Sequence, residues 1–445
     1  MDEKLLKMNA TEYKKYHESF MTNNHGSTAT HTFLYIFFTV QCSLFCSLST
    51  KRPQPLQYIL EYFLIVLPLI TSCTILSEYI YLLNCIVSTM LLTKIMLNYP
   101  KLQIHKTFNT KNYFKTSKLH SISLMRGLTY LMTVFCILAV DFQSFPRYLA
   151  KTEKYGFSLM DSGVGLFVLM SGLVHKDLRN QSLNSILKGN IKFLSILICL
   201  GVARFISVKQ LDYQEHVTEY GVHWNFFFTV AICKLISTVL LYYCNNSILC
   251  GFVILGLHES MLHLGLKQWV FGNTPRTNII NANREGISSS LGYVSLYLFA
   301  AYLKSEIKKD TVKKYEVQLK LMFLSIIMSL LAVTAHFYSP ASRTLANAGY
   351  CFYLQTVLVV IMMIMYFLEV QFQNKDLQFH VPLIISAINS NGLVYFLVAN
   401  LLTGAINLLM RTLFISAFKS FILQNIYMIL TIFLAAYLKE KGISV

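Results

Sequence analysis

The sequence carries little charge for its length. Lys, Arg, Asp and Glu make up 13% of its 445 residues, about half of the roughly 25% that is typical of soluble domains. Hydrophobic residues make up 55% of the chain, and apolar runs of about 20 residues, long enough to cross a bilayer as helices, recur along most of it. This composition excludes a soluble enzyme and predicts an all-α, polytopic integral membrane protein.

Several motifs of common enzyme classes are also missing. No GxSxG, Walker, HxxxxD or HExxH motif occurs in a plausible position, which removes the best-known signatures of hydrolases, nucleotide-binding proteins and zinc enzymes. The ten cysteines form no CxxC pair and lie mostly within apolar runs, as small hydrophobic residues do. The first 30 residues are polar, so a cleaved signal peptide is not expected. We expect neither a metal site nor a permanently bound cofactor.

The formal net charge of +17 invites comparison with nucleic-acid-binding proteins. The basic residues, however, lie mostly in short loops between apolar segments, where the positive-inside rule places them. The long loops 97–121 and 304–317 carry five lysines each, which predicts that both are cytoplasmic. A nucleic-acid partner is therefore not expected, and membrane lipids surround the chain instead.

The hydropathy pattern predicts about 13 transmembrane helices within one domain, residues 31–438. A polar lumenal segment, 1–30, precedes this domain, and a short cytoplasmic tail, 439–445, follows it; the odd number of spans puts the two termini on opposite sides. The segment 247–266 contains His258, Glu259 and His263, and the segment 391–410 contains three asparagines. The expected spans are 31–49, 56–74, 77–97, 122–141, 157–175, 190–207, 224–244, 247–266, 286–303, 318–338, 347–370, 391–410 and 418–438.

The loops on the non-cytoplasmic side carry most of the unusual polar sequence. The stretch 141–165 holds six charged residues between two apolar segments, and charge at a membrane edge is costly unless it is solvated, paired or used. Asp141 ends a span, where desolvation would raise its pKa and suit it as a general base. The alternative is a solvated helix end or an ion pair with Arg147 or Lys151.

Lys151 offers a positive charge in the same stretch. Such a group can stabilise a developing oxyanion or orient a carboxylate. The alternative is an interfacial lysine whose ammonium reaches the membrane surface.

A second polar cluster occupies residues 212–225 and a third begins the span after residue 280. Glu219 and His223 are four residues apart and would share a helix face, but the cluster lacks a standard metal-ligand spacing. Asn283 can cap the next helix, and Arg284 can bind a phosphate at its N-terminus; the alternative is a cap with an ion pair. Asn407 lies inside an apolar run, where interhelical hydrogen bonding is its expected role.

At these same loops the sequence resembles the inositol acyltransferases of glycosylphosphatidylinositol (GPI) anchor biosynthesis. The resemblance covers essentially the full length, and its most specific block is the 17-residue stretch YQEHVTEYGVHWNFFFT. Gln143 and Tyr148 depart from the family pattern. The matching stretches are AVDF at 139–142, FPR at 145–147, AKTE at 150–153, YG at 155–156, MDxGVG at 160–165, the block at 213–229, NANREGI at 281–287, GY at 292–293, SR with AN within 342–347, and TG with INL within 403–408.

The resemblance implies an acyltransferase of the endoplasmic reticulum membrane with about 13 spans and a lumenal N-terminus. It implies transfer of a fatty acyl chain, usually palmitoyl, from acyl-CoA to the inositol of glucosaminyl-phosphatidylinositol. In this family the Asp and Lys that match Asp141 and Lys151 are implicated in catalysis. The candidate substrate-binding residues are Arg147, Glu219, His223, Trp224, Asn225, Asn283, Arg284, Glu285, Arg343, Asn347 and Asn407.

A transporter or flippase for a lipid or an anionic solute is the alternative function, because transporters also carry charge at the mouths of their spans. Such a protein is expected to show paired repeats or broken helices in its two halves. The sequence has no evident internal repeat, which favours the acyltransferase.

Overall fold

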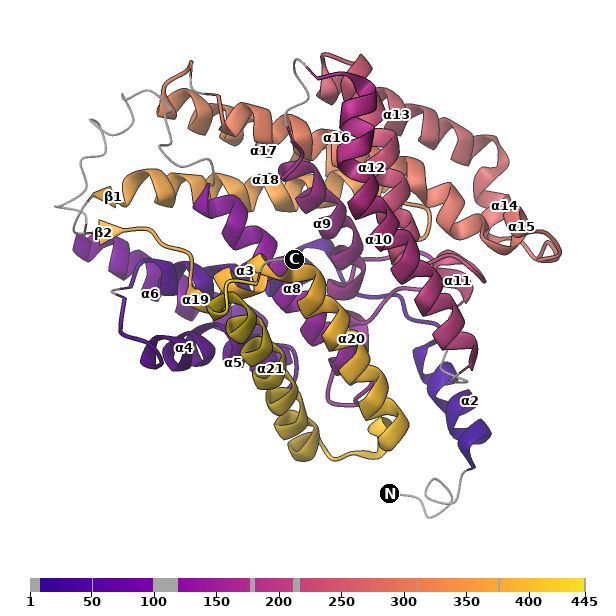
Figure 1. Cartoon of the computed structure of the whole chain (residues 1–445), viewed down its shortest axis with the longest axis horizontal. Coiled ribbons are helices and arrows are strands. Elements are labelled where there is room, and N and C mark those ends of the chain that lie inside the picture. Colours follow the sequence, from indigo (N-terminus) through magenta and orange to yellow (C-terminus); the bar gives the residue numbers. More distant parts are fainter. Residues whose placement is uncertain are drawn as a thin grey trace.

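The protein is almost entirely helical in the computed structural model (Figure 1). Within the part of the chain that the structure describes, eleven helices are long and apolar enough to cross a membrane. The described residues are 9–49, 51–98, 119–176, 181–210, 217–309, 311–374 and 377–443. The long helices are α3 (Ala29–Ser47), α6 (Ile80–Asn98), α8 (His120–Ala139), α10 (Leu183–Gln210), α12 (Phe226–Tyr243), α13 (Ser247–Met261), α16 (Arg284–Ile307), α17 (Lys314–Tyr338), α18 (Ala348–Gln371), α20 (Gly392–Leu409) and α21 (Ala417–Glu440).

Two further apolar segments are shorter. One is Leu56–Ser72, and the other is α9 (Leu159–Leu173). With the eleven long helices they occupy the thirteen predicted spans, so the polytopic helical fold is confirmed. The first of them comprises α4 (Leu56–Glu61), the π-helical turn η1 (Tyr62–Val66) and α5 (Leu67–Ser72).

The predicted spans 247–266 and 391–410, which carry His or Asn residues within their apolar runs, are both helical. Residues 247–266 form α13, which continues through η5 (Leu262–Leu266) into α14 (Lys267–Phe271), and 391–410 corresponds to α20. Gly265 breaks the helical backbone within η5, with φ of 123°. This conformation, which glycine adopts at little cost, lets the polypeptide bend at that point.

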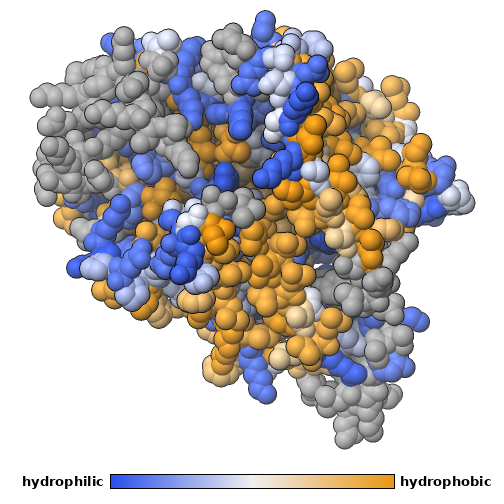
Figure 2. All heavy atoms as spheres, in the orientation of Figure 1, coloured by the Kyte–Doolittle hydropathy of each residue, from blue (hydrophilic) through white to orange (hydrophobic). Residues whose placement is uncertain are grey.

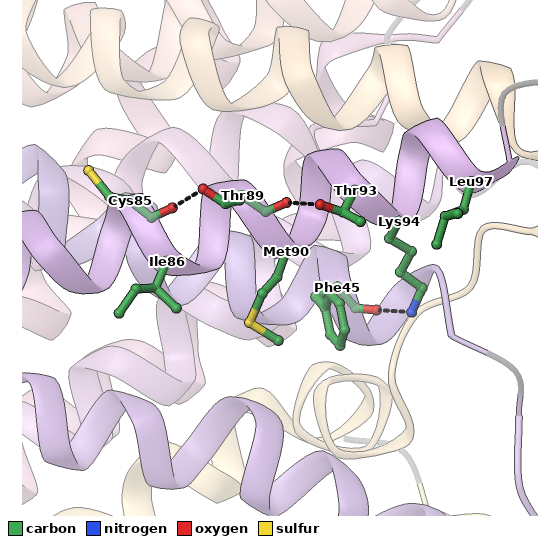
Figure 3. Close-up of a pocket in the computed structure, with 8 residues that line it drawn as sticks. All are labelled: Phe45, Cys85, Ile86, Thr89, Met90, Thr93, Lys94 and Leu97. Atoms are coloured by element: carbon green, nitrogen blue, oxygen red, sulfur yellow. Dashed lines mark hydrogen bonds between the residues drawn. The ribbon is translucent and has the colours of Figure 1, made fainter.

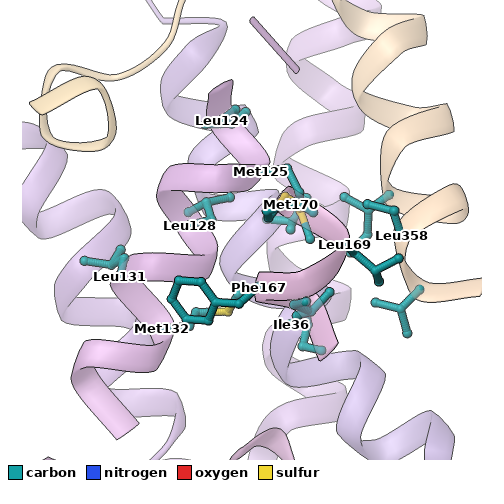
Figure 4. Close-up of a cluster of buried hydrophobic side chains, with 14 of the residues drawn as sticks. Ile36, Leu124, Met125, Leu128, Leu131, Met132, Phe167, Leu169, Met170 and Leu358 are labelled. Carbon is teal, nitrogen blue, oxygen red and sulfur yellow. The ribbon is translucent and has the colours of Figure 1, made fainter. Parts of the chain in front are cut away.

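Helices α3, α8, α16 and α18 form the centre of the molecule. In α16, 78% of the apolar window is buried, against 17% in the segment containing α6. Figure 4 shows side chains of α3, α8, α9 and α18 packed together, among them Ile36, Leu128, Phe167 and Leu358. Apolar side chains on the outer helices are exposed instead, and Figure 2 shows hydrophobic residues gathered over α20 and α21.

Helix α9 is short for a membrane span. Its 15 residues extend about 22 Å, less than the roughly 30 Å of hydrocarbon in a bilayer. Irregular backbone at membrane depth is tolerated where protein buries it, and the segment before α9 meets this condition because Phe142, Phe145 and Leu149 are buried. The short helix therefore lets residues 140–158 pack among the other helices.

Residues 383–390 differ from the expectation, because this stretch lies in a predicted loop yet forms a buried helix, α19 (Leu383–Ser390). The buried Glu61 carboxylate accepts hydrogen bonds from the amides of Leu383 and Ile384, at 2.8 and 2.7 Å. These bonds satisfy the first amides of the helix. The helix is too short to read as a span from hydropathy. A small hairpin, β1 (Gln373–Asn374) with β2 (Leu377–Gln378), precedes it.

The polar N-terminal segment contains a docked helix, α2 (Ala10–Met21), which starts at a capping box formed by Asn9 and Glu12. The Tyr13 hydroxyl accepts a hydrogen bond from the amide of Leu413, at 3.2 Å. This contact joins α2 to the turn η6 (Thr412–Phe414) between α20 and α21. The segment before the first span therefore packs back onto the helical domain.

Candidate active site

Asp141 lies just beyond the end of α8, in the turn that leads away from this helix. Its side chain is buried, with the residue 5% exposed. The Asn407 amide donates a hydrogen bond to Oδ2 at 2.7 Å, and the Nε2 atom of His17 lies 3.6 Å from Oδ1. Three elements distant in sequence, α2, α8 and α20, thus meet at one carboxylate.

Burial favours the protonated form of Asp141, whereas its polar neighbours favour the carboxylate. Burial raises the pKa of this carboxyl from 3.8 to about 7, and the Asn407 hydrogen bond and the Lys151 charge oppose the rise only in part. A general base is most effective when its pKa is near the working pH. Asp141 therefore has the protonation behaviour of a base that works near neutrality.

Lys151 follows the short 3₁₀ turn η4 (Arg147–Leu149) and forms an ion pair with Glu219 of α11 (Val217–Tyr220). The Lys151 side chain is 40% exposed and the Glu219 side chain 15% exposed. The adjacent Thr152 donates hydrogen bonds from its amide and its hydroxyl to Asp161 Oδ2, at 3.0 and 2.7 Å. The backbone that carries Lys151 is therefore fixed to the start of α9.

Glu219 links Lys151 to a second, deeper cation. Its Oε1 atom lies 3.9 Å from a terminal nitrogen of Arg343. Arg343 in turn donates from Nε to Asp161 Oδ1, at 2.8 Å. Although burial alone would lower the pKa of Arg343, the neighbouring carboxylates of Glu219 and Asp161 raise it, so the guanidinium keeps its charge. Lys151, Glu219, Arg343 and Asp161 form a chain of alternating charge, which we call the four-residue network.

Four more of the predicted site residues hold the polar loops to one another. The Asn283 side-chain oxygen accepts hydrogen bonds from the amides of His223 and Trp224, at 2.8 and 3.0 Å. Asn225 caps α12 and donates to the carbonyl of Gly201 at 2.9 Å. The indole of Trp224 donates to the hydroxyl of Thr229 at 2.9 Å. The structure brings these four residues together, but the polar groups described here bind other parts of the protein.

Arg284 and Glu285 lie at the start of α16, and both bind protein groups. Arg284 donates to the carbonyl of Thr274 at 3.0 Å and to that of Gly272 at 2.6 Å. Glu285 accepts from Arg276 at 3.0 Å. These bonds close the loop between α14 and α15 (Ile279–Ala282) onto α16. The geometry therefore favours an ion pair over a phosphate site at this position. The predicted cap is wrong, because Asn283 makes no side-chain hydrogen bond to the first amides of α16 and its oxygen binds the His223 and Trp224 amides instead.

Asn347 and Arg147 are the remaining predicted site residues. Asn347 caps α18 and donates to the carbonyl of Pro340 at 2.7 Å. The Arg147 guanidinium lies 4.6 Å from the centre of the Phe20 ring of α2, and its half-burial lowers its pKa. Both residues border the site. The hydrogen bonds and ion pairs of Asp141 described above involve neither of them.

A separate apolar groove of about 690 Å³ lies along α6 (Figure 3). Helix α6 supplies most of its wall, and Phe45 of α3 completes it. Lys94 lies at one end, where its ammonium donates to the carbonyl of Phe45 at 3.1 Å. None of the predicted site residues lines this groove.

Two residues of the site were not among the predicted ones. Asp161 lies within the charged stretch, but its pairing with Arg343 across 182 residues has no local signal. His17 lies on a helix whose capping box, Asn9 with Glu12, is visible in the sequence. That motif predicts the start of α2, yet it says nothing of where the helix docks.

Known proteins match this chain over almost its full length. A protein-family model described as GWT1 matches residues 13–438. The chain is 31% identical to the GPI-anchored wall transfer protein 1 of Schizosaccharomyces pombe, over 97% of this chain and 99% of that protein. It is 30% identical to the phosphatidylinositol-glycan biosynthesis class W protein of Dictyostelium discoideum, over 98% and 99%. It is also 30% identical to the glucosaminyl-phosphatidylinositol-acyltransferase PIGW of Bos taurus, over 93% and 95%.

Proposed function

The chain belongs to the GWT1 family, and from this premise we propose how it acts as a glucosaminyl-phosphatidylinositol acyltransferase of GPI-anchor biosynthesis. The acceptor is a hydroxyl of the inositol ring. The donor is acyl-CoA, with a palmitoyl chain. The enzyme works as a multi-pass protein of the endoplasmic reticulum membrane, with residues 1–30 in the lumen and 439–445 in the cytoplasm.

The buried carboxylate of Asp141 carries the mechanistic part of the proposal. Transfer of an acyl group from a thioester to a hydroxyl requires a base for the hydroxyl proton and a positive group near the tetrahedral oxyanion. Asp141, with its pKa raised by burial to about 7, takes the proton. The ammonium of Lys151, whose charge already acts on Asp141, stabilises the oxyanion or orients the base. The inositol oxygen forms the new ester bond while the carbon–sulfur bond breaks and the thiolate takes up a proton.

The other predicted residues have supporting roles in this mechanism. Glu219 and Arg343 hold Lys151 through the four-residue network. Asn283, His223, Trp224 and Asn225 keep the polar loops together. Asn407 holds Asp141 directly. Acyl transfer is direct, without an acyl-enzyme, because the sequence shows no Ser or Cys triad.

The test is acyl transfer by purified protein in reconstituted membranes, with glucosaminyl-phosphatidylinositol and palmitoyl-CoA. Asp141→Asn keeps the size of the side chain and one acceptor oxygen, which can still face the Asn407 amide, but it cannot accept the proton. We expect kcat/KM to fall by about 10²- to 10⁴-fold, with a normal elution profile in detergent. Near-normal turnover of the folded variant would disprove the role of Asp141, and equal turnover without palmitoyl-CoA would disprove the donor.

The orientation has its own test. The chain carries the glycosylation sequons Asn9-Ala-Thr11 and Asn180-Gln-Ser182. With a lumenal N-terminus, the first is accessible to lumenal glycosylation and the second is not. Glycosylation of Asn180 without that of Asn9 would reverse the orientation.

A further inference from the structure

The N-terminal helix α2 reaches the candidate active site through a specific set of contacts. Tyr13 packs edge-on against Phe414, with ring centres 5.4 Å apart. Its hydroxyl lies 3.4 Å from the Thr412 hydroxyl, and the Arg411 guanidinium lies 5.7 Å from the centre of its ring. All three partners belong to the connection that follows α20, the helix that supplies Asn407. The docking of α2 and the position of Asn407 are therefore tied to the same segment.

His17 stands one helical turn after Tyr13 and therefore on the same face of α2. The two rings are 5.9 Å apart. The docked helix leaves His17 only 1% exposed, with Nε2 at 3.6 Å from Asp141 Oδ1. A buried imidazole so close to a buried carboxylate is within range of a strong electrostatic interaction, because little water is present to screen it.

The other polar and titratable groups around Asp141 do not remove the need for a nearby cation. Asn407 supplies a neutral donor on the Oδ2 side. Lys151 supplies positive charge, but its ammonium is already paired with Glu219. Tyr427 of α21 directs its hydroxyl to the carbonyls of Val134 and Ala399, each at 3.2 Å. An uncompensated buried carboxylate is costly, whereas an opposite charge within about 4–6 Å favours the ionised form.

We propose that His17 is a positioning residue that keeps Asp141 in its carboxylate form, by holding an imidazolium beside Oδ1. The inference rests on the proposed function of Asp141 as the proton acceptor. The N-terminal helix thereby becomes part of the active site, although it lies outside the helical domain predicted from hydropathy. The role requires a positive charge at position 17, not an imidazole as such.

Four variants test the charge requirement: His17→Gln, which removes the charge, His17→Lys, which keeps it, Asp141→Asn, and Lys15→Gln as a control at an exposed position of the same helix. The readout is kcat/KM for palmitoyl transfer to glucosaminyl-phosphatidylinositol in reconstituted membranes, between pH 5.5 and 8.5. In the pH profile, kcat/KM rises with pH on the acid side, which we call the acid limb. We expect the acid limb of His17→Gln to lie about one pH unit higher than that of the unmodified protein. One unit is the lower end of the pKa shift that a close opposite charge produces. Below the limb, kcat/KM then falls about tenfold against the unmodified protein, and the two profiles approach each other at pH 8.5, where Asp141 is largely ionised in both proteins.

His17→Lys should retain the acid limb of the unmodified protein or move it lower, because a lysine stays charged across this range. Lys15→Gln should leave the profile unchanged. A His17→Gln profile that coincides with the unmodified one overturns the inference. So does a loss that is uniform across pH and is not relieved in His17→Lys, since that pattern indicates a packing defect.

The two levels of the proposal fail in different ways. If folded Asp141→Asn protein retains near-normal turnover, Asp141 is not the proton acceptor, whatever the His17 variants do. If Asp141→Asn is inactive and His17→Gln keeps the unmodified profile, the proposed function stands and only the role of His17 is wrong. Should His17→Gln fail to fold, the acid limb of His17→Lys decides: a limb displaced toward higher pH contradicts the role.

Discussion

The guanidinium of Arg343 donates a hydrogen bond to the carboxylate of Asp161 at 2.8 Å, and each of these side chains is only 3% exposed. Arg343 lies in the loop before α18, and Asp161 lies in the first turn of α9. The pair therefore joins two loops of the candidate active site. The same Asp161 carboxylate holds the backbone of Thr152, next to Lys151.

Replacing Arg343 by Met should strongly destabilise the protein. The substitution leaves the Asp161 charge buried without its guanidinium, and breaking such a pair costs about 3–5 kcal/mol. The melting temperature in detergent measures the effect. Arg52→Met is the matched control, because Arg52 is exposed and its loss should leave the melting temperature unchanged. If the two variants melt together, the ion pair does not stabilise the fold.

Glu219→Gln tests the four-residue network without removing either cation. The amide keeps the shape of the side chain but leaves Lys151 and Arg343 without the carboxylate between them. We expect kcat/KM to fall about tenfold, the equivalent of one pKa unit of interaction energy, because Lys151 is no longer held in place. Glu78→Gln changes an exposed carboxylate in the turn η2 (Ser77–Tyr79) and should be silent. Equal activity of the two variants would show that Lys151 does not depend on Glu219.

The stability of Asp141→Asn should exceed that of the unmodified protein above neutral pH. The folded state raises the pKa of Asp141 from 3.8 to about 7, so it binds this proton more tightly than the unfolded state does. Stability is then present below about pH 4 and is lost as the pH rises toward 7. Asparagine resembles the protonated acid and avoids this loss. A melting temperature higher by roughly 2–5 °C at pH 8, with no difference at pH 4, is the expected result; the reverse order would contradict a raised pKa.

The transmembrane helices were predictable because hydropathy acts locally. The segment predicted at 224–244 is α12, Phe226–Tyr243, and Asn225 is its cap because an asparagine side chain satisfies the first free amides of a helix. The cost of charge at a membrane edge made Asp141 and Lys151 candidates, but their catalytic roles came from the family resemblance and remain a prediction. Asn407 was predicted to form a hydrogen bond between helices. It binds Asp141, in the turn that directly follows α8.

The contacts between distant loops were not predictable from one sequence. Nothing near residue 17 or residue 161 indicates which segment each will meet, because docking depends on how the helices assemble. The same limit explains α19, whose burial depends on Glu61, more than 300 residues earlier in the chain. Counting the spans between the polar loops predicted that these loops lie on the same, non-cytoplasmic side of the membrane. The count carried no information on which side chains contact one another.

A pair of glycines offers a final test of how loop and helix are joined. A Cβ atom at Gly292 of α16 would lie 2.0 Å from the carbonyl oxygen of Ala346. Ala346 itself has a positive φ, of 47°, so the loop between residues 342 and 347 is already constrained and cannot easily move away. Gly292→Ala should therefore displace this loop and, with it, the contact between Arg343 and Asp161.

Gly404→Ala is the matched control, because a Cβ atom there meets nothing within 4 Å. In the middle of α20 this substitution should be neutral or stabilising by up to about 1 kcal/mol, since alanine favours the helix over glycine. Gly292→Ala should instead lower both the melting temperature and kcat/KM, because the displaced loop releases the four-residue network that holds Lys151. A loss of stability with full activity would mean that the network tolerates movement of the loop. A Gly292→Ala protein that matches Gly404→Ala in both measurements would contradict the close packing of α16 against this loop.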